Sequence, residues 1–361
     1  MRYACRPFLS RAGVVSSGRI IEMPHKKTTM MAIALALVLS AAANANSIYV
    51  FTSFDGPGNN GGGTTVNAID NNGDVVGFSS DNAANPTQLT NFIRNPNGTF
   101  SSLNINSDPL AMANGINDAL FVVGASNNNA FRPAGGTFMT LPPAVNGETA
   151  SETAFGTNDG FLIVGQFTDN ATDTTPDFLL SGNTFTTLNP VSNAAVTNAQ
   201  AVNDNGLVTG FYSTDGVHQH GFFYISTTDT FTLPPDPNIP NLVLTQFLGI
   251  NDFGLAVGYY QLPDGSQHGF LYDTGTQTYT FLDDPSAAAI GVSITQITGV
   301  NDAGEITGFY VDAATGLQRG FIATAVPEPG TFALLIGSLL LMSISRIRFI
   351  RMNRSVRRRS P

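Results

Sequence analysis

A ten-residue pattern recurs six times in the middle of the chain, and it limits the possible folds more than any other feature. Its clearest copy, residues 202–211, reads Val-Asn-Asp-Asn-Gly-Leu-Val-Thr-Gly-Phe, and the other copies start at residues 69, 116, 157, 250 and 300. In each copy a glycine stands eight residues after the first position, and successive glycines are 47, 41, 45, 48 and 50 residues apart. This spacing predicts a domain built from six similar units.

Each unit carries the signals of about four short strands. The Asn-Asp-x-Gly segment predicts a tight turn, because Asn, Asp and Gly tolerate positive φ. In the fourth unit, strand-like stretches follow at residues 207–211, 219–224 and 230–231, and a last strand leads into the next turn. Four strands in a repeat of about 40–50 residues are typical of a β-propeller blade. We therefore predict an all-β, β-propeller-like domain of about six four-stranded repeats over residues 46–325, with a β-solenoid as the alternative.

The N-terminal end of this domain matches a piece that the last repeat lacks. The sixth repeat ends at residues 321–323 without its last strand, whereas residues 49–57 match residues 279–285 of the fifth repeat. We expect the N-terminal strand to complete the last blade. Such closure removes the open sheet edges that invite aggregation, and a solenoid does not explain the displaced strand.

The turn pattern, followed by His-Gly-Phe-Leu-Tyr at residues 268–272, resembles the HAF family of probable extracellular repeats. The resemblance covers residues 66–323, although this chain has Gly where that family typically has Ala, and Arg319 replaces the last histidine. The family implies no catalytic role that can be carried over to this chain.

Charge is distributed very unevenly along the chain. Residues 46–326 contain 3 basic and 24 acidic residues, a net charge of −21, and no lysine. Such a surface repels nucleic acid, so we expect no nucleic-acid partner. Cys5 is the only cysteine and precedes the domain, which therefore has no disulfide.

The N-terminal region has the three parts of a secretory signal peptide. A basic stretch, residues 25–27, precedes an apolar stretch, residues 30–39. A small-x-small site then predicts cleavage between Ala45 and Asn46, with Ala43 as the other small residue. Residues 1–45 are thus a signal region, with the signal peptide at about 23–45, and export uses the Sec machinery. The start, Met1 or Met23, stays open.

The C-terminal region, residues 326–361, combines a short motif, an apolar helix and a basic tail. We predict a membrane helix over residues 332–350. The motif residues before it are Val326, Pro327, Glu328, Pro329 and Gly330. The basic residues after it are Arg346, Arg348, Arg351, Arg354, Arg357, Arg358 and Arg359, and we expect them to stay cytoplasmic.

This ordered tail resembles the PEP-CTERM sorting signal. The resemblance implies that an exosortase, an inner-membrane cysteine protease, cleaves near Pro327-Glu328-Pro329. The protein would then lie in the inner membrane only transiently, before it reaches the cell surface or the extracellular matrix of a biofilm, where extracellular polysaccharide is a partner. The alternative is a permanent single-span anchor.

Two groups of residues are weak candidates for metal ligands. His218 and His220 are two residues apart, which places both imidazoles on one face of a strand. Asp70, Asn72 and Asp74 offer oxygens at alternate positions, like the start of a calcium loop. The glycine and glutamate positions of such a loop do not match, and turn formation also explains the pattern. We expect no cofactor beyond weakly bound calcium.

Aromatic residues follow most of the repeated glycines and suit either a core or a carbohydrate-binding surface. Because side chains alternate along a strand, about half of them should pack between blades. The set is Phe78, Phe211, Tyr212, Tyr259, Tyr260, Phe309 and Tyr310.

We find no catalytic residues in the sequence, because no serine lies in a nucleophile elbow and the domain has no cysteine. The sequence therefore predicts an exported, exosortase-sorted surface or matrix protein with a non-enzymatic binding or structural propeller. One alternative is a secreted polysaccharide-active enzyme that uses the adjacent Asp283 and Asp284. Another is a permanently membrane-anchored receptor.

Overall fold

The computed structural model describes residues 48–326, apart from residues 83, 85, 142–148, 171, 173 and 288–291, together with Ser338. Residues 49–326 form one compact unit. Within the described residues, no helix is both long enough and apolar enough to cross a membrane. The expected membrane helix, residues 332–350, lies outside the described residues except for Ser338.

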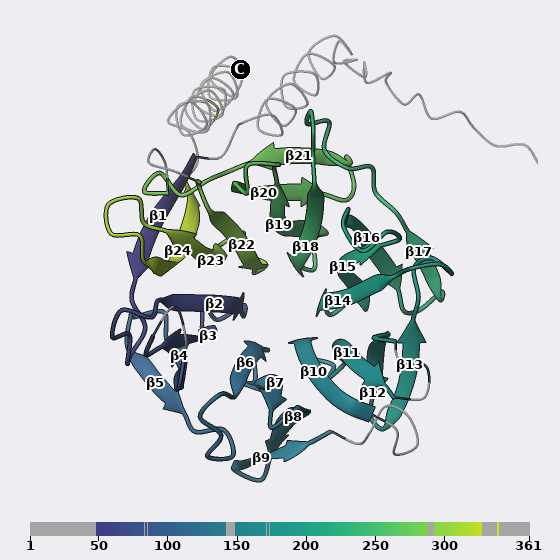
Figure 1. The fold of residues 1–361 in the computed structure, drawn as a ribbon, viewed down its shortest axis with the longest axis horizontal. Helices are drawn as coiled ribbons and strands as arrows, with labels where there is room; N and C mark the ends of the chain where they lie inside the picture. Colours follow the sequence, from purple (N-terminus) through teal and green to yellow (C-terminus); the bar gives the residue numbers. More distant parts are fainter. Residues whose placement is uncertain are drawn as a thin grey trace, which may run out of the picture. The chain divides into compact units, whose positions relative to one another are not determined.

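The unit is a six-bladed β-propeller, as the repeat predicted (Figure 1). Each blade is a four-stranded sheet. The strands of the first three blades are β2 (Thr64–Ile69), β3 (Val75–Ser80), β4 (Leu89–Arg94), β5 (Phe100–Leu103), β6 (Met112–Gly115), β7 (Val123–Ser126), β8 (Asn129–Ala134), β9 (Thr137–Thr140), β10 (Thr149–Thr157), β11 (Ile163–Asp169), β12 (Asp177–Ser181) and β13 (Thr184–Leu188). Those of the last three are β14 (Val196–Val202), β15 (Leu207–Ser213), β16 (His220–Ile225), β17 (Thr230–Thr232), β18 (Leu244–Ile250), β19 (Leu255–Gln261), β20 (Gln267–Asp273), β21 (Thr278–Phe281), β22 (Thr295–Val300), β23 (Ile306–Val311), β24 (Gln318–Val326) and β1 (Ile48–Phe54).

The displaced strand is confirmed, because β1 pairs with β24 as the outermost strand of blade 6. The Phe51 ring packs on Phe321 with centroids 5.0 Å apart, and the Tyr310 hydroxyl donates to Ser53 Oγ at 3.0 Å. These contacts join residues more than 250 positions apart in the chain and close the ring, which rules out the solenoid.

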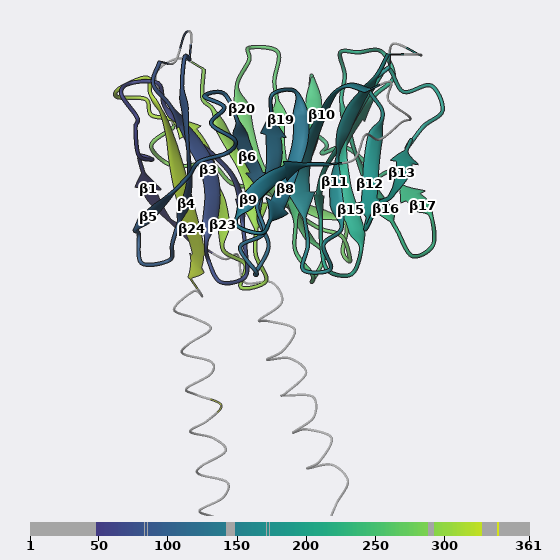
Figure 2. The ribbon, with the colours of Figure 1, turned by 90° about the horizontal axis from the view of Figure 1, so that it is seen from below.

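The first strand of each blade lies nearest the central axis (Figure 1). In β14 and β18, buried and half-buried residues alternate along most of this strand. Seen from the side, the connecting loops lie at two opposite faces of the propeller (Figure 2). The Asn-Asp-x-Gly turns join the first and second strands, so all six lie at one of these faces.

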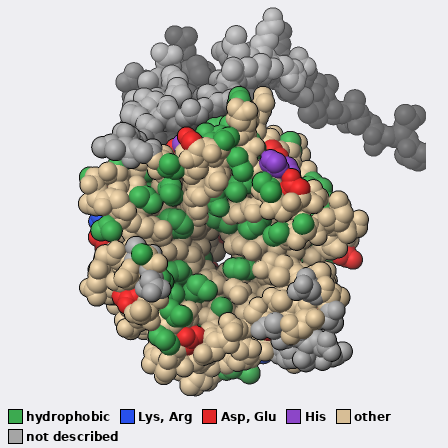
Figure 3. Space-filling view, viewed as in Figure 1, with side chains coloured by type: hydrophobic (Ala, Val, Ile, Leu, Met, Phe, Trp, Pro, Cys, Tyr) green, Lys and Arg blue, Asp and Glu red, His purple; other side chains and the backbone are tan. Residues whose placement is uncertain are grey.

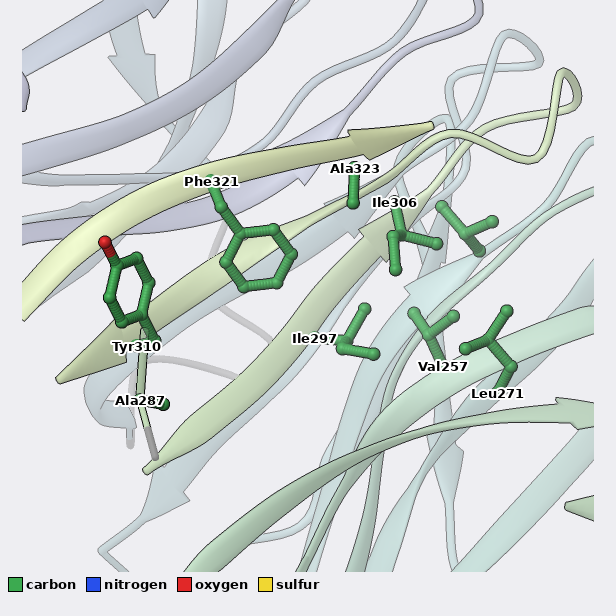
Figure 4. Close-up of a cluster of buried hydrophobic side chains, with 9 residues drawn as sticks. Val257, Leu271, Ala287, Ile297, Ile306, Tyr310, Phe321 and Ala323 are labelled. Carbon is green, nitrogen blue, oxygen red and sulfur yellow. The ribbon is translucent and has the colours of Figure 1, made fainter. Parts of the chain in front are cut away.

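The core is a set of clusters between neighbouring blades. Between blades 5 and 6, Val257 and Leu271 face Ile297, Ile306 and Phe321 (Figure 4). One buried phenylalanine occupies the same position of the third strand in every blade: Phe92, Phe131, Phe178, Phe222, Phe270 and Phe321. This position explains the phenylalanine of the His-Gly-Phe pattern.

The repeated glycine is required by close packing within each blade. A Cβ at Gly258 would lie 2.9 Å from the Phe270 ring and would collide with the Gln246 carbonyl oxygen. The innermost strand brings this carbonyl close, because it carries a β-bulge next to the residue that pairs with the glycine.

Candidate functional site

A β-bulge occurs at the same place in the innermost strand of every blade. In β18, for example, Phe247 pairs with Gly258 and Gly249 pairs with Val257, so Leu248 is the extra residue. Bulges redirect side chains and are common beside functional sites. All six bulged residues line the central channel. They are Asn67, Asn114, Phe155, Gln200, Leu248 and Thr298.

These residues surround a cavity of about 310 Å³. Gln246 and Gln296 of the innermost strands also line it, as do Phe211 and Phe309 of the second strands β15 and β23. Among the described residues that line it, none carries a formal charge. Figure 3 shows the central opening, with few charged side chains around it on the viewed face. The cavity therefore presents amides and aromatic rings to a ligand.

Hydrogen bonds to the protein hold the polar groups of the wall. Asn67 Nδ2 donates to the Ala113 carbonyl, and Asn114 Nδ2 donates to the Ala154 carbonyl. Each acceptor belongs to the next blade, and each bond is 2.9 Å long. Gln296 Nε2 donates to Gln267 Oε1 at 2.7 Å. The amides are thus fixed before a ligand binds, which lowers the entropy cost of binding.

An apolar waist separates this cavity from the turn face. Four apolar residues and Thr157 line both the cavity and a smaller hollow among the Asn-Asp turns; the apolar ones are Ile69, Ile116, Val202 and Ile250. Small residues follow the bulges here, and a Cβ at Gly249 would lie 3.0 Å from Gly299 Cα of the next blade. Neighbouring blades consequently approach each other most closely around the waist.

Two rings of hydrogen bonds surround the axis at the turn face. In the inner ring, Asn203 is typical: its Nδ2 donates to the Asn251 carbonyl of the next blade at 2.9 Å. In the outer ring, the Asp204 backbone N–H donates to Asp252 Oδ1 at 2.8 Å. The outer ring is complete through all six blades and consists of Asn71, Asp118, Asp159, Asp204, Asp252 and Asp302.

The outer ring gathers five carboxylates at one mouth of the channel. Burial, followed by repulsion from neighbouring ring carboxylates, raises the pKa of Asp204 and of Asp252 above the usual value. Burial likewise raises the pKa of Asp159. This mouth therefore repels anionic ligands.

Of the predicted calcium ligands, Asp70 and Asp74 lie together in the first turn. Asp70 Oδ1 accepts hydrogen bonds from the N–H groups of Asn72 at 3.0 Å and Asp74 at 2.8 Å. Asn72 Nδ2 instead donates to the Asp118 carbonyl at 3.0 Å. Burial, and then repulsion by Asp74 and Asp118, raises the pKa of Asp70 to about 6, against the N–H groups that lower it.

The structure gives His218 and His220 separate carboxylate partners. His218 Nδ1 lies 2.7 Å from Asp215 Oδ2, and His220 Nδ1 lies 2.6 Å from Asp236 Oδ2. Within the described part of the chain, no three His, Cys, Asp or Glu side chains gather as a ready metal site. The two histidines thus make two separate hydrogen bonds to carboxylates.

The repeated histidine joins the third strand of a blade to the loop that follows its fourth strand. His220 pairs with Asp236 in blade 4, and His268 pairs with Asp283 at 2.7 Å in blade 5. In blade 6, Arg319 replaces the histidine and forms two bonds of 3.1 Å to Asp55, which follows β1. The substitution therefore preserves the link.

In blade 5 the structure also places a serine beside the histidine, which sequence reasoning missed. Ser266 Oγ lies 3.2 Å from His268 Nε2, while Asp283 holds His268 Nδ1. Ser266 is buried, and its hydroxyl donates to Asp264 at 2.7 Å. The Ser-x-His spacing at the start of β20 was the available signal. Asp284 points elsewhere and accepts from the Ser286 N–H, so it forms no pair with Asp283.

The aromatic residues after the repeated glycines divide as strand alternation predicted. Phe211 and Phe309 reach the cavity, whereas Tyr310 is buried in the core. Tyr212 and Tyr260 pack on the histidine rings of their blades, at 5.6 and 5.1 Å between centroids.

The signal-cleavage residues, most of the sorting motif and the basic tail lie outside the described residues. Val326 of the sorting motif is described, and it ends β24 as an exposed residue.

No family model and no curated protein matches this chain, but many solved structures match its fold. A gluconolactonase from Xanthomonas campestris is 9% identical, with 80% of this chain and 93% of that chain covered and a TM-score of 0.50. The Aleuria aurantia lectin is 13% identical over 78% of this chain and 95% of that chain, with a TM-score of 0.42. A Trypanosoma rangeli sialidase is 11% identical over 78% of this chain but only 56% of that chain, with a TM-score of 0.44.

The gluconolactonase match corrects the prediction that the protein is not an enzyme. The gluconolactonase shares the propeller fold along most of both chains, so this fold accommodates catalysis in other proteins. The prediction was wrong because it took the lack of a recognisable sequence motif as a lack of activity. Fold alone establishes neither a reaction nor a substrate.

Proposed function

We propose that the protein binds an uncharged, hydroxyl-rich ligand, such as the end of a neutral oligosaccharide, in the central channel. The observation that carries this proposal is the bulge repeated in all six innermost strands. Five of the six blades place a polar group or an aromatic ring on the wall in this way, whereas Leu248 is aliphatic. Amides recognise hydroxyl groups, and aromatic rings cover the apolar faces of sugars.

Electrostatics supports a neutral ligand over an anionic one. The cavity wall is uncharged among its described residues, and the neighbouring mouth holds the five aspartates of the outer ring together with Asp70. An anionic polysaccharide would meet repulsion both there and from the net charge of −21.

The proposal includes export to the surface or matrix. It is supported by the signal features of residues 23–45 and by the PEP-CTERM-like tail, residues 326–361. We propose exosortase cleavage near Pro327-Glu328-Pro329. Mass spectrometry of protein isolated from the source cells should find the C-terminus near this motif, whereas an intact arginine tail would refute cleavage.

A glycan array probed with the full-length chain tests the binding proposal. We expect binding to neutral oligosaccharides and weaker or no binding to uronic-acid polymers. Gln200→Leu should lower affinity about tenfold or more, because Gln200 lines the cavity and its Nε2 bonds only within its own blade, to Asn198.

Gln88→Leu is the matched control, since Gln88 is exposed and lies outside the cavity wall. Equal affinity of the Gln200→Leu variant and the parent would refute binding in the channel. Every glycan that binds should also be assayed for turnover, because the fold accommodates catalysis elsewhere.

A further inference from the structure

One of the six blade junctions at the turn face lacks a hydrogen-bond donor. In five blades the first turn residue is an asparagine whose Nδ2 donates to the carbonyl of the equivalent residue in the next blade, at 2.9–3.2 Å. In blade 1 this residue is Asp70. The junction between blades 1 and 2 therefore differs from the others by a single atom, an oxygen in place of a nitrogen.

The orientation of Asp70 follows that of the asparagines. In blade 5, Asn251 Oδ1 accepts from the N–H groups two and four residues later, at 3.1 and 2.9 Å. Asp70 Oδ1 accepts from the corresponding N–H groups of Asn72 and Asp74. From this correspondence we infer that Asp70 Oδ2 takes the place of the amide nitrogen, on the side of the Asn117 carbonyl. Asp70 is 4% exposed, and its Oδ2 has no hydrogen-bond partner.

Blade 6 shows which other group reaches this position. There, Asn301 Nδ2 donates to the Asp70 carbonyl at 3.2 Å and also to Glu305 Oε2 at 2.9 Å. Asp74 stands at the position of Glu305 in blade 1, and its Oδ1 is also buried without a partner. Asp74 therefore follows Asp70 at the spacing from which Glu305 reaches the amide in blade 6, and its charge acts on the Asp70 carboxyl.

No protein cation neutralises this group within the described residues. The charges that act on Asp70 are the carboxylates of Asp74 and Asp118. Arg94, the nearest basic residue in the sequence, lies over the Phe54 ring at 4.8 Å and donates to the Asn95 carbonyl.

We propose that a calcium ion bridges blades 1 and 2, bound by the carboxylates of Asp70 and Asp74 and the carbonyl of Asn117, with water as the remaining ligands. Calcium accepts oxygen ligands of mixed type in irregular geometry, whereas magnesium requires near-octahedral geometry and loses its water reluctantly. With only three protein oxygens the site is weak, with a Kd of about 10⁻⁴–10⁻³ M, the range of extracellular calcium modules. This inference does not depend on the ligand of the channel.

Thermal unfolding of the full-length chain tests this site. Calcium chloride at about 10 mM should raise the Tm by several degrees relative to EDTA, and magnesium chloride at the same concentration should not. Asp70→Asn restores the amide of the other five blades. This variant should unfold at a higher temperature than the parent in EDTA and should lose the calcium-dependent rise.

Asp177→Asn is the matched control, because Asp177 is a fully buried aspartate of blade 3 that is remote in sequence from this junction. It should keep the full calcium-dependent rise. The proposal is overturned if calcium does not raise the Tm of the parent, or if Asp70→Asn retains the rise. It is also overturned if the parent gains stability only from acidification, which would show that a proton occupies the junction.

Discussion

Blades 4–6 follow the repeat closely, whereas blades 1–3 depart from it at identifiable positions. In the last three blades the turns have Asn first and Gly fourth, as in residues 203–206. In the first three, Asp70 replaces the asparagine of blade 1, and Leu120 and Phe161 replace the glycine of blades 2 and 3. Leu120 and Phe161 retain the glycine's positive φ, at 57° and 58°.

The two halves nevertheless share the same core and the same outer ring of hydrogen bonds. Phe131 in blade 2 and Phe270 in blade 5 are equally buried, and the Asp118 and Asp252 N–H groups make equivalent bonds. Packing thus maintains the fold in both halves, and the exceptions are confined to polar and turn positions. Such exceptions are expected where a protein gives up stability for function.

The largest effect should come from the shared core. We expect Phe131→Ala and Phe270→Ala each to lower the free energy of unfolding by about 3–5 kcal/mol, because both rings are fully buried. Denaturant unfolding of both variants measures this loss. A much smaller loss in blade 2 than in blade 5 would show that the irregular half is also loosely packed.

The next effect concerns Asp177, which is 0% exposed. Burial raises the pKa of its carboxyl well above the usual value, and the Ala199 N–H and Thr197 hydroxyl offset only part of this rise. Above the usual carboxyl pKa of about 4, the folded chain binds more protons at this residue than the unfolded chain does, so this residue lowers stability as pH rises.

We expect Asp177→Asn to raise the free energy of unfolding by about 2 kcal/mol at pH 7 and by little at pH 4. Asn91, at the equivalent position in blade 1, shows that an amide fits, since it bonds to Ala111 and Ala113 of the next blade at 2.8 Å. Unfolding curves of parent and variant at both pH values test this. A gain that is independent of pH would contradict the assigned cause.

A smaller effect should separate the turns of the two halves. Leu120→Gly should raise stability by about 1 kcal/mol, because glycine adopts positive φ without a Cβ penalty. Gly304→Ala should lower it by a similar amount, since Gly304 has φ 76° and open space around its Cβ position. If neither variant changes the unfolding midpoint, the turns are not strained.

The smallest effect should be that of the surface ion pair which closes the ring. Arg319 and Asp55 are both partly exposed, so we expect Arg319→Ala to cost about 1 kcal/mol. His268→Ala in blade 5 is the comparison, because His268 makes one bond to its aspartate where Arg319 makes two. Denaturant unfolding that shows a loss above about 3 kcal/mol would mean that this pair, and not the paired strands, holds the ring closed.

The repeat was sufficient to predict the six blades and the displaced strand, because both follow from spacing and strand order. The residues of the channel wall were not predictable in the same way. Strict alternation places Asn67 and Gln200 on a packed face of the sheet, and only the bulge turns them toward the axis. The link from His268 to Asp283 joins a strand to a loop that the pairing of β20 with β21 brings close to it.

Hydrogen–deuterium exchange of the full-length chain, with and without a bound neutral oligosaccharide, tests the channel most directly. The account predicts slower exchange in the innermost strands, above all in peptides that cover β14 (Val196–Val202) and β22 (Thr295–Val300). Protection confined to the third strands that carry His220 and His268, β16 (His220–Ile225) and β20 (Gln267–Asp273), with the innermost strands unchanged, would contradict it.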